Sequence, residues 1–134
     1  MEHIFNTSGK HLAQELRDGK YSAVELIEAY IQEIQVVNPR LNAVVRDRFN
    51  LAREEAKEAD HKLQTIDHDQ LPPYLGVPCT VKESFQLSGM PNSAGLRSRE
   101  QVIAKEDAVV VQRLRKSGAI PLGVTNTSEL CMWM

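Results

Sequence analysis

The sequence predicts an α/β fold whose sheet is incomplete within these 134 residues. Two short apolar runs, at 77–81 and 119–124, have the length and composition of buried strands. A helical pattern precedes the second run, so the order strand, loop, helix, strand predicts a right-handed parallel crossover. Parallel strands are normally buried on both faces among several neighbours, and this chain offers only two good strands. We therefore expect the opening section of a larger α/β domain.

Amphipathic helices are predicted for the first third of the chain. The first of them should cover 10–17. Ser22 and Glu25 have the spacing of a capping box, in which each side chain bonds the other's backbone N–H, and this predicts the start of a longer helix. Its apolar positions at helical spacing are Leu26, Ile27, Tyr30, Ile31, Ile34 and Val37. Asn38-Pro39 should end this helix, because the residue before a proline disfavours helical angles.

A weak strand, an exposed helix and a loop are expected next. The short β-branched run at 41–45 is compatible with a brief third strand. The segment 49–63 is rich in Ala, Glu and Lys and has opposite charges four residues apart, which is typical of an exposed helix. Histidines, other polar residues and two prolines at 65–73 indicate a loop.

The second half of the chain alternates loop and regular structure. Residues 84–105 are expected to be mostly loop because they are rich in turn-forming residues. Asp107 is a suitable N-cap for a helix that runs to 116, and Gly118 stands where a left-handed C-cap residue belongs. After the second strand, a further helix is predicted from Ser128.

Composition and charge exclude several classes of protein. The chain is 42% hydrophobic and 25% charged, which is a globular composition. Its 16 Lys and Arg against 18 Asp and Glu give a formal net charge of −2, so no nucleic-acid partner is expected. No apolar run is long enough to span a bilayer, and the N-terminus lacks a secretory signal. A soluble intracellular protein without a transmembrane segment is predicted.

Neither a metal nor a cofactor is expected. Cys79 and Cys131 lie far apart and form no CxxC pair, which argues against a structural zinc site and a disulfide framework. The histidines and aspartates between 61 and 69 are better explained as a solvated loop than as metal ligands. No GxGxxG and no Walker A motif is present, so phosphate binding has no support.

The candidate chemical groups follow the two predicted strands, because functional groups gather at the carboxyl ends of strands in open α/β sheets. They are Lys82-Glu83-Ser84 and Thr125-Asn126-Thr127. Strand alternation sends Lys82 and Glu83 to opposite faces, so they need not form an ion pair. A partly desolvated lysine has a lowered pKa and acts as a neutral base. The alternative is a lysine whose stem covers apolar surface while its ammonium reaches water.

Two other nucleophilic side chains have simpler interpretations. Ser84 is close enough in sequence to pair with Lys82, but a loop or capping serine is the favoured interpretation. Cys79 lies within a strand and is best explained as a small core residue. Its nearest histidine in sequence, His68, lies in a polar loop with no acid or amide placed to orient it. A cysteine–histidine enzyme is therefore not expected.

Ordered motifs run from about Ser22 to the last residue. The segment 75–84 reads Leu-Gly-Val-Pro-Cys-Thr-Val-Lys-Glu-Ser. Other motifs are Asn38-Pro39-Arg40-Leu41-Asn42-Ala43, the loop Gly89-x-x-x-Ser93-x-Gly95, Asp107-Ala108-x-Val110-Val111, Gly118-Ala119 and Thr125-Asn126. Together they resemble the amidase signature family, whose members carry Gly-Val/Ile-Pro-x-x-Val-Lys-Asp/Glu. Within that family, residues 90–93, 103–105 and 128–133 look most like the type-2 fatty-acid amide hydrolases.

The resemblance implies a fold, an activity and site residues. The fold would be an α/β/α amidase-signature domain with a mixed sheet, of which 1–134 is the N-terminal portion, with a helical lead-in at 1–65 and a βαβ core at 75–134. The activity would be hydrolysis of amides by a Ser–Ser–Lys triad, with Lys82 as the catalytic base. Cys131 and Met132 would bind the substrate, a small lipid amide, although an apolar core helix explains them equally well. A homodimer is compatible with the resemblance.

The chain also departs from the family's pattern. Both serines and the oxyanion donors belong to a downstream Gly-Gly-Ser-Ser-Gly-Gly-type segment, and no serine here matches either position. We therefore expect the 134-residue chain alone to be inactive and marginally folded. Type-2 hydrolases tend to carry an N-terminal membrane-embedded segment that this sequence does not show, so membrane association stays open.

Two other functions are compatible with the sequence. One is a non-enzymatic interaction module built on the helices of 10–37 and an open sheet edge. The other stays within the family and is the A-type amidotransferase component that acts on misacylated tRNA. The lack of a basic face and the segment 128–133 argue against that second alternative.

Overall fold

The computed structural model describes residues 2–133 and confirms a mixed α/β fold. Its helices and strands are α1 (Gly9–Arg17), α2 (Ala23–Leu41), β1 (Val44–Asp47), α3 (Phe49–Thr65), β2 (Pro78–Lys82), α4 (Val109–Lys116) and β3 (Ile120–Thr125). The strand order is β1-β3-β2, in which β2 is parallel to β3 and β1 is antiparallel to it. The predicted parallel pair is confirmed, and the weak third strand completes a mixed sheet.

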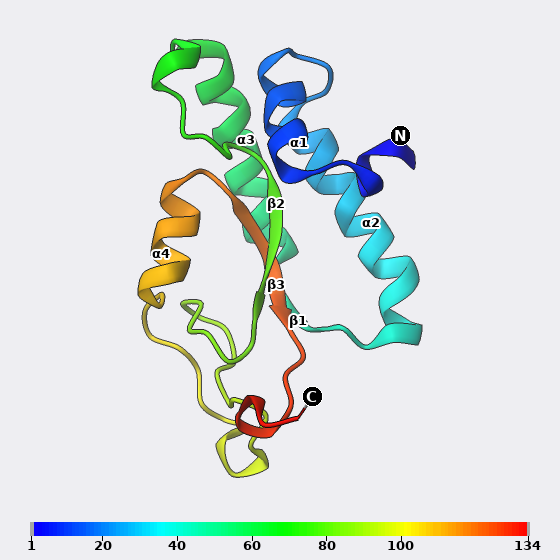
Figure 1. Cartoon of the computed structure of the whole chain (residues 1–134), viewed down its shortest axis with the longest axis vertical. Coiled ribbons are helices and arrows are strands. Elements are labelled where there is room, and N and C mark those ends of the chain that lie inside the picture. The colour runs from blue at the N-terminus through cyan, green and yellow to red at the C-terminus, as the bar shows by residue number, and fades with distance from the viewer. Residues whose placement is uncertain (1, 134) are drawn as a thin grey trace.

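Two apolar clusters lie on opposite sides of the β2–β3 pair. The larger cluster joins α1, α2 and α3 to Ile120 and Leu122 of β3. The smaller cluster joins Val124 of β3 to Val81 of β2 and Val111 of α4. Figure 1 shows α4 on one side of the strands and α2 on the other. The sheet is therefore covered on both sides along part of its length, as parallel pairing requires.

An irregularity in β3 lets one strand serve both clusters. Cys79 pairs with Pro121 but Val81 pairs with Val124, so β3 contains one extra residue between these positions. Because side chains alternate along a strand, the extra residue turns Val124 to the α4 side, while Leu122 packs against α1–α3. Gly123 lies in this stretch, where a Cβ would come within 2.4 Å of the carbonyl oxygen of Arg46 in β1. Only glycine permits so close an approach of the two backbones.

The start of α2 agrees with the prediction and its end does not. Ser22 Oγ accepts from the backbone N–H of Glu25 at 3.1 Å, and the Glu25 carboxylate accepts from the N–H of Ser22 at 2.8 Å. The helix does not stop at Asn38-Pro39 but continues to Leu41, with Pro39 in its last turn. A clamp across the end of the helix accompanies this extension, in which the Asn38 side chain accepts from Val44 N at 2.8 Å and donates to Val44 O at 2.9 Å. The same clamp moves the start of β1 from the predicted residue 41 to Val44.

Helix α3 is longer and less exposed than predicted. It extends to Thr65, two residues beyond the predicted end. Its alanines at 52, 56 and 59 are buried against the larger cluster, so only one face of the helix is exposed. Small residues on this face allow the helix to lie close to its neighbours.

Helix α4 begins later than predicted, and the expected helix at the end of the chain is absent from the described residues. Ala108 is the N-cap of α4, while Asp107 instead accepts from the backbone N–H of Ser88 at 2.7 Å. Gly118 has a φ of +95°, which confirms the predicted left-handed position. From Ser128 the described chain forms only the 3₁₀ turn Glu129–Cys131, in which Leu130 has a φ of +50° and cannot continue a helix.

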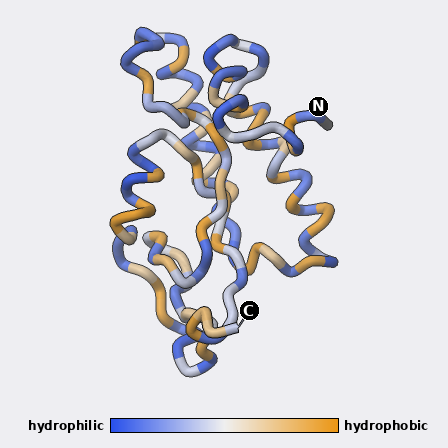
Figure 2. Tube along the Cα trace, viewed as in Figure 1, coloured by the Kyte–Doolittle hydropathy of each residue, from blue (hydrophilic) through white to orange (hydrophobic). Residues whose placement is uncertain are grey.

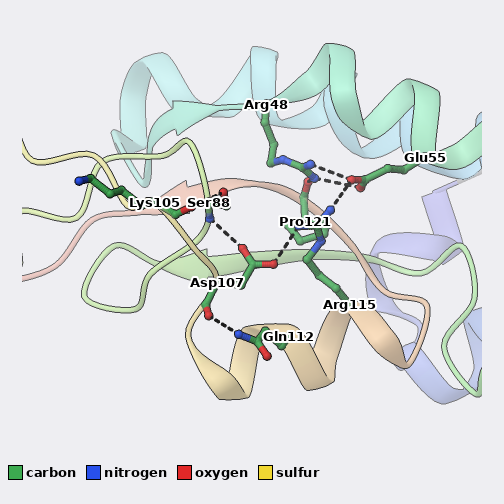
Figure 3. A network of polar contacts seen from close by, with 8 residues as sticks. All are labelled: Arg48, Glu55, Ser88, Lys105, Asp107, Gln112, Arg115 and Pro121. Atoms are coloured by element: carbon green, nitrogen blue, oxygen red, sulfur yellow. Dashed lines mark hydrogen bonds and ion pairs between the residues drawn. The ribbon is translucent and has the colours of Figure 1, made fainter.

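A partly buried charge network links α3 to α4 across the strands, as Figure 3 shows. Arg48 is 8% exposed and donates to both oxygens of Glu55 at 2.9 and 2.7 Å and to the Pro121 carbonyl at 2.8 Å. Arg115 of α4 donates to the same Glu55 at 2.9 Å and to Asp107 at 2.9 Å. A buried guanidinium is tolerated only when its donors have partners. Glu55 is the acceptor shared by both arginines, so the network depends on it.

Large apolar side chains are also exposed outside the two clusters. Figure 2 shows apolar stretches in the last turns of α2 and the first turn of α4. Val36 is 72% exposed, and Leu41, Val109 and Val110 are each more than half exposed. None of the helices in residues 2–133 combines the length and the apolar character needed to cross a membrane.

We predict that Glu55→Gln destabilises the protein by about 1.5–3 kcal/mol, the scale of a lost hydrogen bond to a charged group. In the wild type, the guanidinium groups of Arg48 and Arg115 share the two oxygens of the Glu55 carboxylate. The glutamine amide offers them a single oxygen as acceptor. The measurement is the midpoint of unfolding in urea. Glu54→Gln, at an exposed position one residue earlier, is the control and should leave the midpoint unchanged. Equal midpoints for the two variants would contradict the role given to Glu55.

Candidate functional site

The carboxyl ends of β2 and β3 lie side by side, as the sequence predicts. Lys82 is the register partner of Thr125. The backbone pairing continues beyond the strand, because the N–H of Glu83 donates to the Thr125 carbonyl at 2.9 Å. The next residue along β3, Asn126, donates its N–H to Ala43 O just before β1, at 2.8 Å. The two predicted groups of polar residues, 82–84 and 125–127, therefore form one edge of the sheet.

Lys82 reaches this edge with an exposed side chain. Its neighbour Val81 is buried in the cluster beneath α4, so strand alternation directs Lys82 away from that cluster. After the hydroxyl of Thr127, the charge of the Lys82 ammonium is one of the causes that lower the pKa of the Cys131 thiol.

Cys131 lies next to Lys82 on an exposed segment. Its Sγ is 3.3 Å from Thr127 Oγ1. The hydroxyls of Thr127 and Ser84, and then the charge of Lys82, lower the pKa of the Cys131 thiol below its ordinary value. Ser84 thus lies near Lys82 as well, in the turn that follows β2. This edge therefore gathers an amine, a thiol and two hydroxyls.

Met132 and Trp133 continue the segment as exposed apolar side chains, 81% and 83% exposed. Together with Leu130 they line an open hollow on the surface. Within residues 2–133 this segment forms a 3₁₀ turn and is exposed, so the described chain does not place Cys131 and Met132 in an apolar core helix. Apolar side chains at the rim of a polar strand edge are suited to contact an apolar ligand.

Cys79 occupies a different environment. It lies within β2 and is half-buried. Burial raises the pKa of its thiol to about 12, which leaves it protonated and unreactive at neutral pH. Within residues 2–133, no three His, Cys, Asp or Glu side chains converge to hold a metal ion.

Glu83 is a site residue whose role sequence reasoning missed. It is 4% exposed, and its carboxylate accepts from the backbone N–H groups of Ser93 and Ala94, the latter at 2.8 Å. Asn92 Nδ2 donates to the Glu83 carbonyl at 2.9 Å. No local pattern in the sequence pointed to this contact, because the two partners lie ten and eleven residues apart in a stretch without regular structure.

Comparisons with known proteins identify the family of the chain. A family model described as Amidase matches residues 25–134. The chain belongs to the amidase family. Over 98% of its length it is 52% identical to fatty-acid amide hydrolase 2-B of Danio rerio, of which it covers 26%.

More distant members of the family share the same region. The chain is 36% identical, over 90% of its length, to the A-type component of the glutamyl-tRNA(Gln) amidotransferase of Coxiella burnetii, of which it covers 24%. The X-ray structure of the peptide amidase of Stenotrophomonas maltophilia aligns with this chain with a TM-score of 0.80 and 32% identity. The alignment covers 92% of this chain and 25% of the peptide amidase. The chain thus spans about a quarter of the length of the relatives it matches.

We predict that iodoacetamide modifies Cys131 of the 134-residue chain well before Cys79. The thiolate is the reactive form, and Thr127 favours it at Cys131 while burial disfavours it at Cys79. The rate at Cys131 should reach half its plateau at a pH below the pKa of an ordinary cysteine. Mass spectrometry of the modified peptides as a function of pH gives both rates. Thr127→Val keeps the shape but removes the hydroxyl and should raise that half-plateau pH, and an unchanged value would count against the assignment.

Proposed function

We propose that the intact protein hydrolyses amides of fatty acids. The observation that carries the proposal is the 52% identity to fatty-acid amide hydrolase 2-B over nearly the whole chain. The arrangement of the strand edge supports it, because a lysine, hydroxyl groups and exposed apolar side chains lie together there.

Lys82 is the base of the proposed reaction. In its neutral form it takes a proton from a bridging serine, which in turn takes one from a nucleophilic serine. The nucleophilic oxygen attacks the amide carbon, and backbone N–H groups stabilise the oxyanion. The C–N bond then breaks as the departing amine receives a proton by the same route. Water finally hydrolyses the acyl ester and restores the serine. By resemblance, both serines are expected C-terminal to residue 134.

The assignment of Lys82 as the base rests on the resemblance of residues 75–84 to the family motif, and its position at the end of β2 is compatible with it. A lysine at the carboxyl end of a strand is held by backbone pairing, here between Glu83 N and Thr125 O. Its exposure in the described chain means that the neutral form requires a cover from the rest of the enzyme. The segment 128–133 would contact the acyl chain, with Cys131 and Met132 nearest to the base.

An amidotransferase component is the alternative within the family. The 36% identity to the Coxiella burnetii protein supports family membership but is well below the identity to the fatty-acid amide hydrolase. A net charge of −2 also gives no basic surface for tRNA. Activity of the intact protein on fatty-acid amides, without glutamine-dependent amide transfer, would distinguish the two.

We predict that Lys82→Ala in the intact protein lowers kcat by at least about 10²-fold, the scale of lost acid–base catalysis. Lys82→Arg should be equally impaired, because a guanidinium stays protonated and cannot act as a base. Release of amine from a fatty-acid amide measures turnover. Lys116→Ala, an exposed lysine in the last turn of α4, is the matched control and should retain full activity. Near wild-type turnover in Lys82→Ala would remove Lys82 from the mechanism.

We predict that a fluorophosphonate probe does not label the 134-residue chain. Such probes react with activated serines, and no serine of this chain matches a catalytic position of the family. Labelling is read by mass spectrometry, with the intact protein as the positive control. Covalent modification of any serine between 1 and 134 would refute this expectation and would place the nucleophile within this region.

A further inference from the structure

The buried carboxylate of Glu83 has no part in the proposed proton transfers. No Lys, Arg or His within residues 2–133 forms an ion pair with it, although it is 4% exposed. Burying a carboxylate is costly unless its oxygens accept strong hydrogen bonds, and here both oxygens accept from the backbone of one loop. The position of that loop, at Ser93-Ala94, is therefore coupled to the position of Glu83.

The loop in turn supports the segment at the end of the described chain. The carbonyl of Ala94 accepts from the N–H of Leu130 at 2.8 Å. Gly95 has a φ of +76°, and a Cβ there would lie 2.7 Å from the Ser128 carbonyl oxygen. The backbones of the loop and of residues 128–130 are thus in direct contact, with no room for a side chain between them.

Lys82 and Glu83, which are adjacent at the end of β2, are therefore connected to the segment 128–133 through different contacts. Lys82 pairs through the sheet with Thr125, which lies three residues before Ser128 in the chain. Glu83, which strand alternation directs to the other face, reaches Leu130 through Ala94. The Glu83 contact therefore contributes, together with the pairing of Lys82 and Thr125, to where residues 128–130 lie relative to Lys82.

We propose that Glu83 is a positioning residue that fixes the segment 128–133 relative to Lys82 and so determines how the enzyme recognises the acyl chain. The proposal rests on the proposed function, because it takes the exposed apolar segment to be the surface that contacts the substrate. Met132 and Trp133 are the side chains whose placement depends on it.

Glu83→Gln is the informative substitution. The amide has nearly the same shape, but its nitrogen is a donor that would face the N–H of Ser93 or Ala94. One of the two hydrogen bonds is lost and the loop must move, which displaces the segment 128–133. Contacts with the acyl chain should then weaken in proportion to the number of methylene groups that touch this segment.

The experiment measures kcat/KM of the intact protein for a homologous series of primary amides of unbranched fatty acids. In the wild type we expect an increase of up to about fourfold for each methylene group that becomes buried. In Glu83→Gln we expect kcat/KM to increase by less than about twofold for each methylene group added over the same range of chain lengths. A loss of folded enzyme would lower all rates by one factor and leave this dependence on chain length unchanged, and fluorophosphonate titration of active sites corrects for it.

Three further variants sharpen the result. Gly95→Ala pushes on Ser128 from the other side of the contact and should flatten the dependence on chain length without altering Glu83. Glu83→Asp keeps a carboxylate that accepts two hydrogen bonds and should lie between Gln and the wild type. Glu100→Gln changes an exposed carboxylate that lines, with Glu83, a cavity of about 230 Å³ and should behave as the wild type.

An unchanged dependence on chain length in both Glu83→Gln and Gly95→Ala would overturn the proposal. If Glu83→Gln does not fold, Glu83→Asp is measured in its place. A dependence of kcat/KM on chain length equal to that of the wild type in Glu83→Asp would then overturn the proposal. The two proposals fail separately. Full activity of Lys82→Ala contradicts the proposed function, whereas an inactive Lys82→Ala with an unaltered Glu83→Gln contradicts only the positioning role.

Discussion

The parallel pairing of β2 with β3 is the interaction on which the rest of the structure depends. It joins residues 82–84 to 125–127, which are more than forty positions apart in sequence. The extra residue in β3 lets that strand bury side chains on both sides, and Gly123 lets β1 approach closely enough to complete the mixed sheet. Hydrogen bonding continues past the strand to Glu83, so the pairing reaches the candidate residues at the strand edge.

The sequence was informative wherever a residue's partner is close to it in the chain. The Ser22 and Glu25 capping box and the left-handed Gly118 are local features, and both are as predicted. Predictions went wrong where the partner lies outside the residue's own turn of helix. Asn38 bonds Val44 beyond the end of α2, and Asp107 bonds Ser88 and Arg115, so the local rules for proline and for N-caps did not hold.

The same distinction applies to the candidate site. That Lys82 follows a strand and lies beside residues 125–127 could be predicted, because the carboxyl ends of parallel strands share an edge. The role of Glu83 could not, since alternation shows only that it points away from Lys82 and gives no information about the loop at 93–95 that it binds. The exposure of Lys82 and of Met132 was equally inaccessible, because exposure depends on every element that packs nearby.

Position and environment are separate requirements of a lysine base, and the described residues supply the first. Backbone pairing at Thr125 and the Glu83 contact with its loop fix where the amine and the apolar segment stand. A neutral amine also requires exclusion of water, and an acyl chain gains affinity only when its contacts are enclosed. Lys82, Met132 and Trp133 are all exposed in the described chain, so one element that covered them would desolvate both the proposed base and the proposed acyl contacts. In the proposed enzyme, chemistry and chain-length recognition would therefore depend on the same closure.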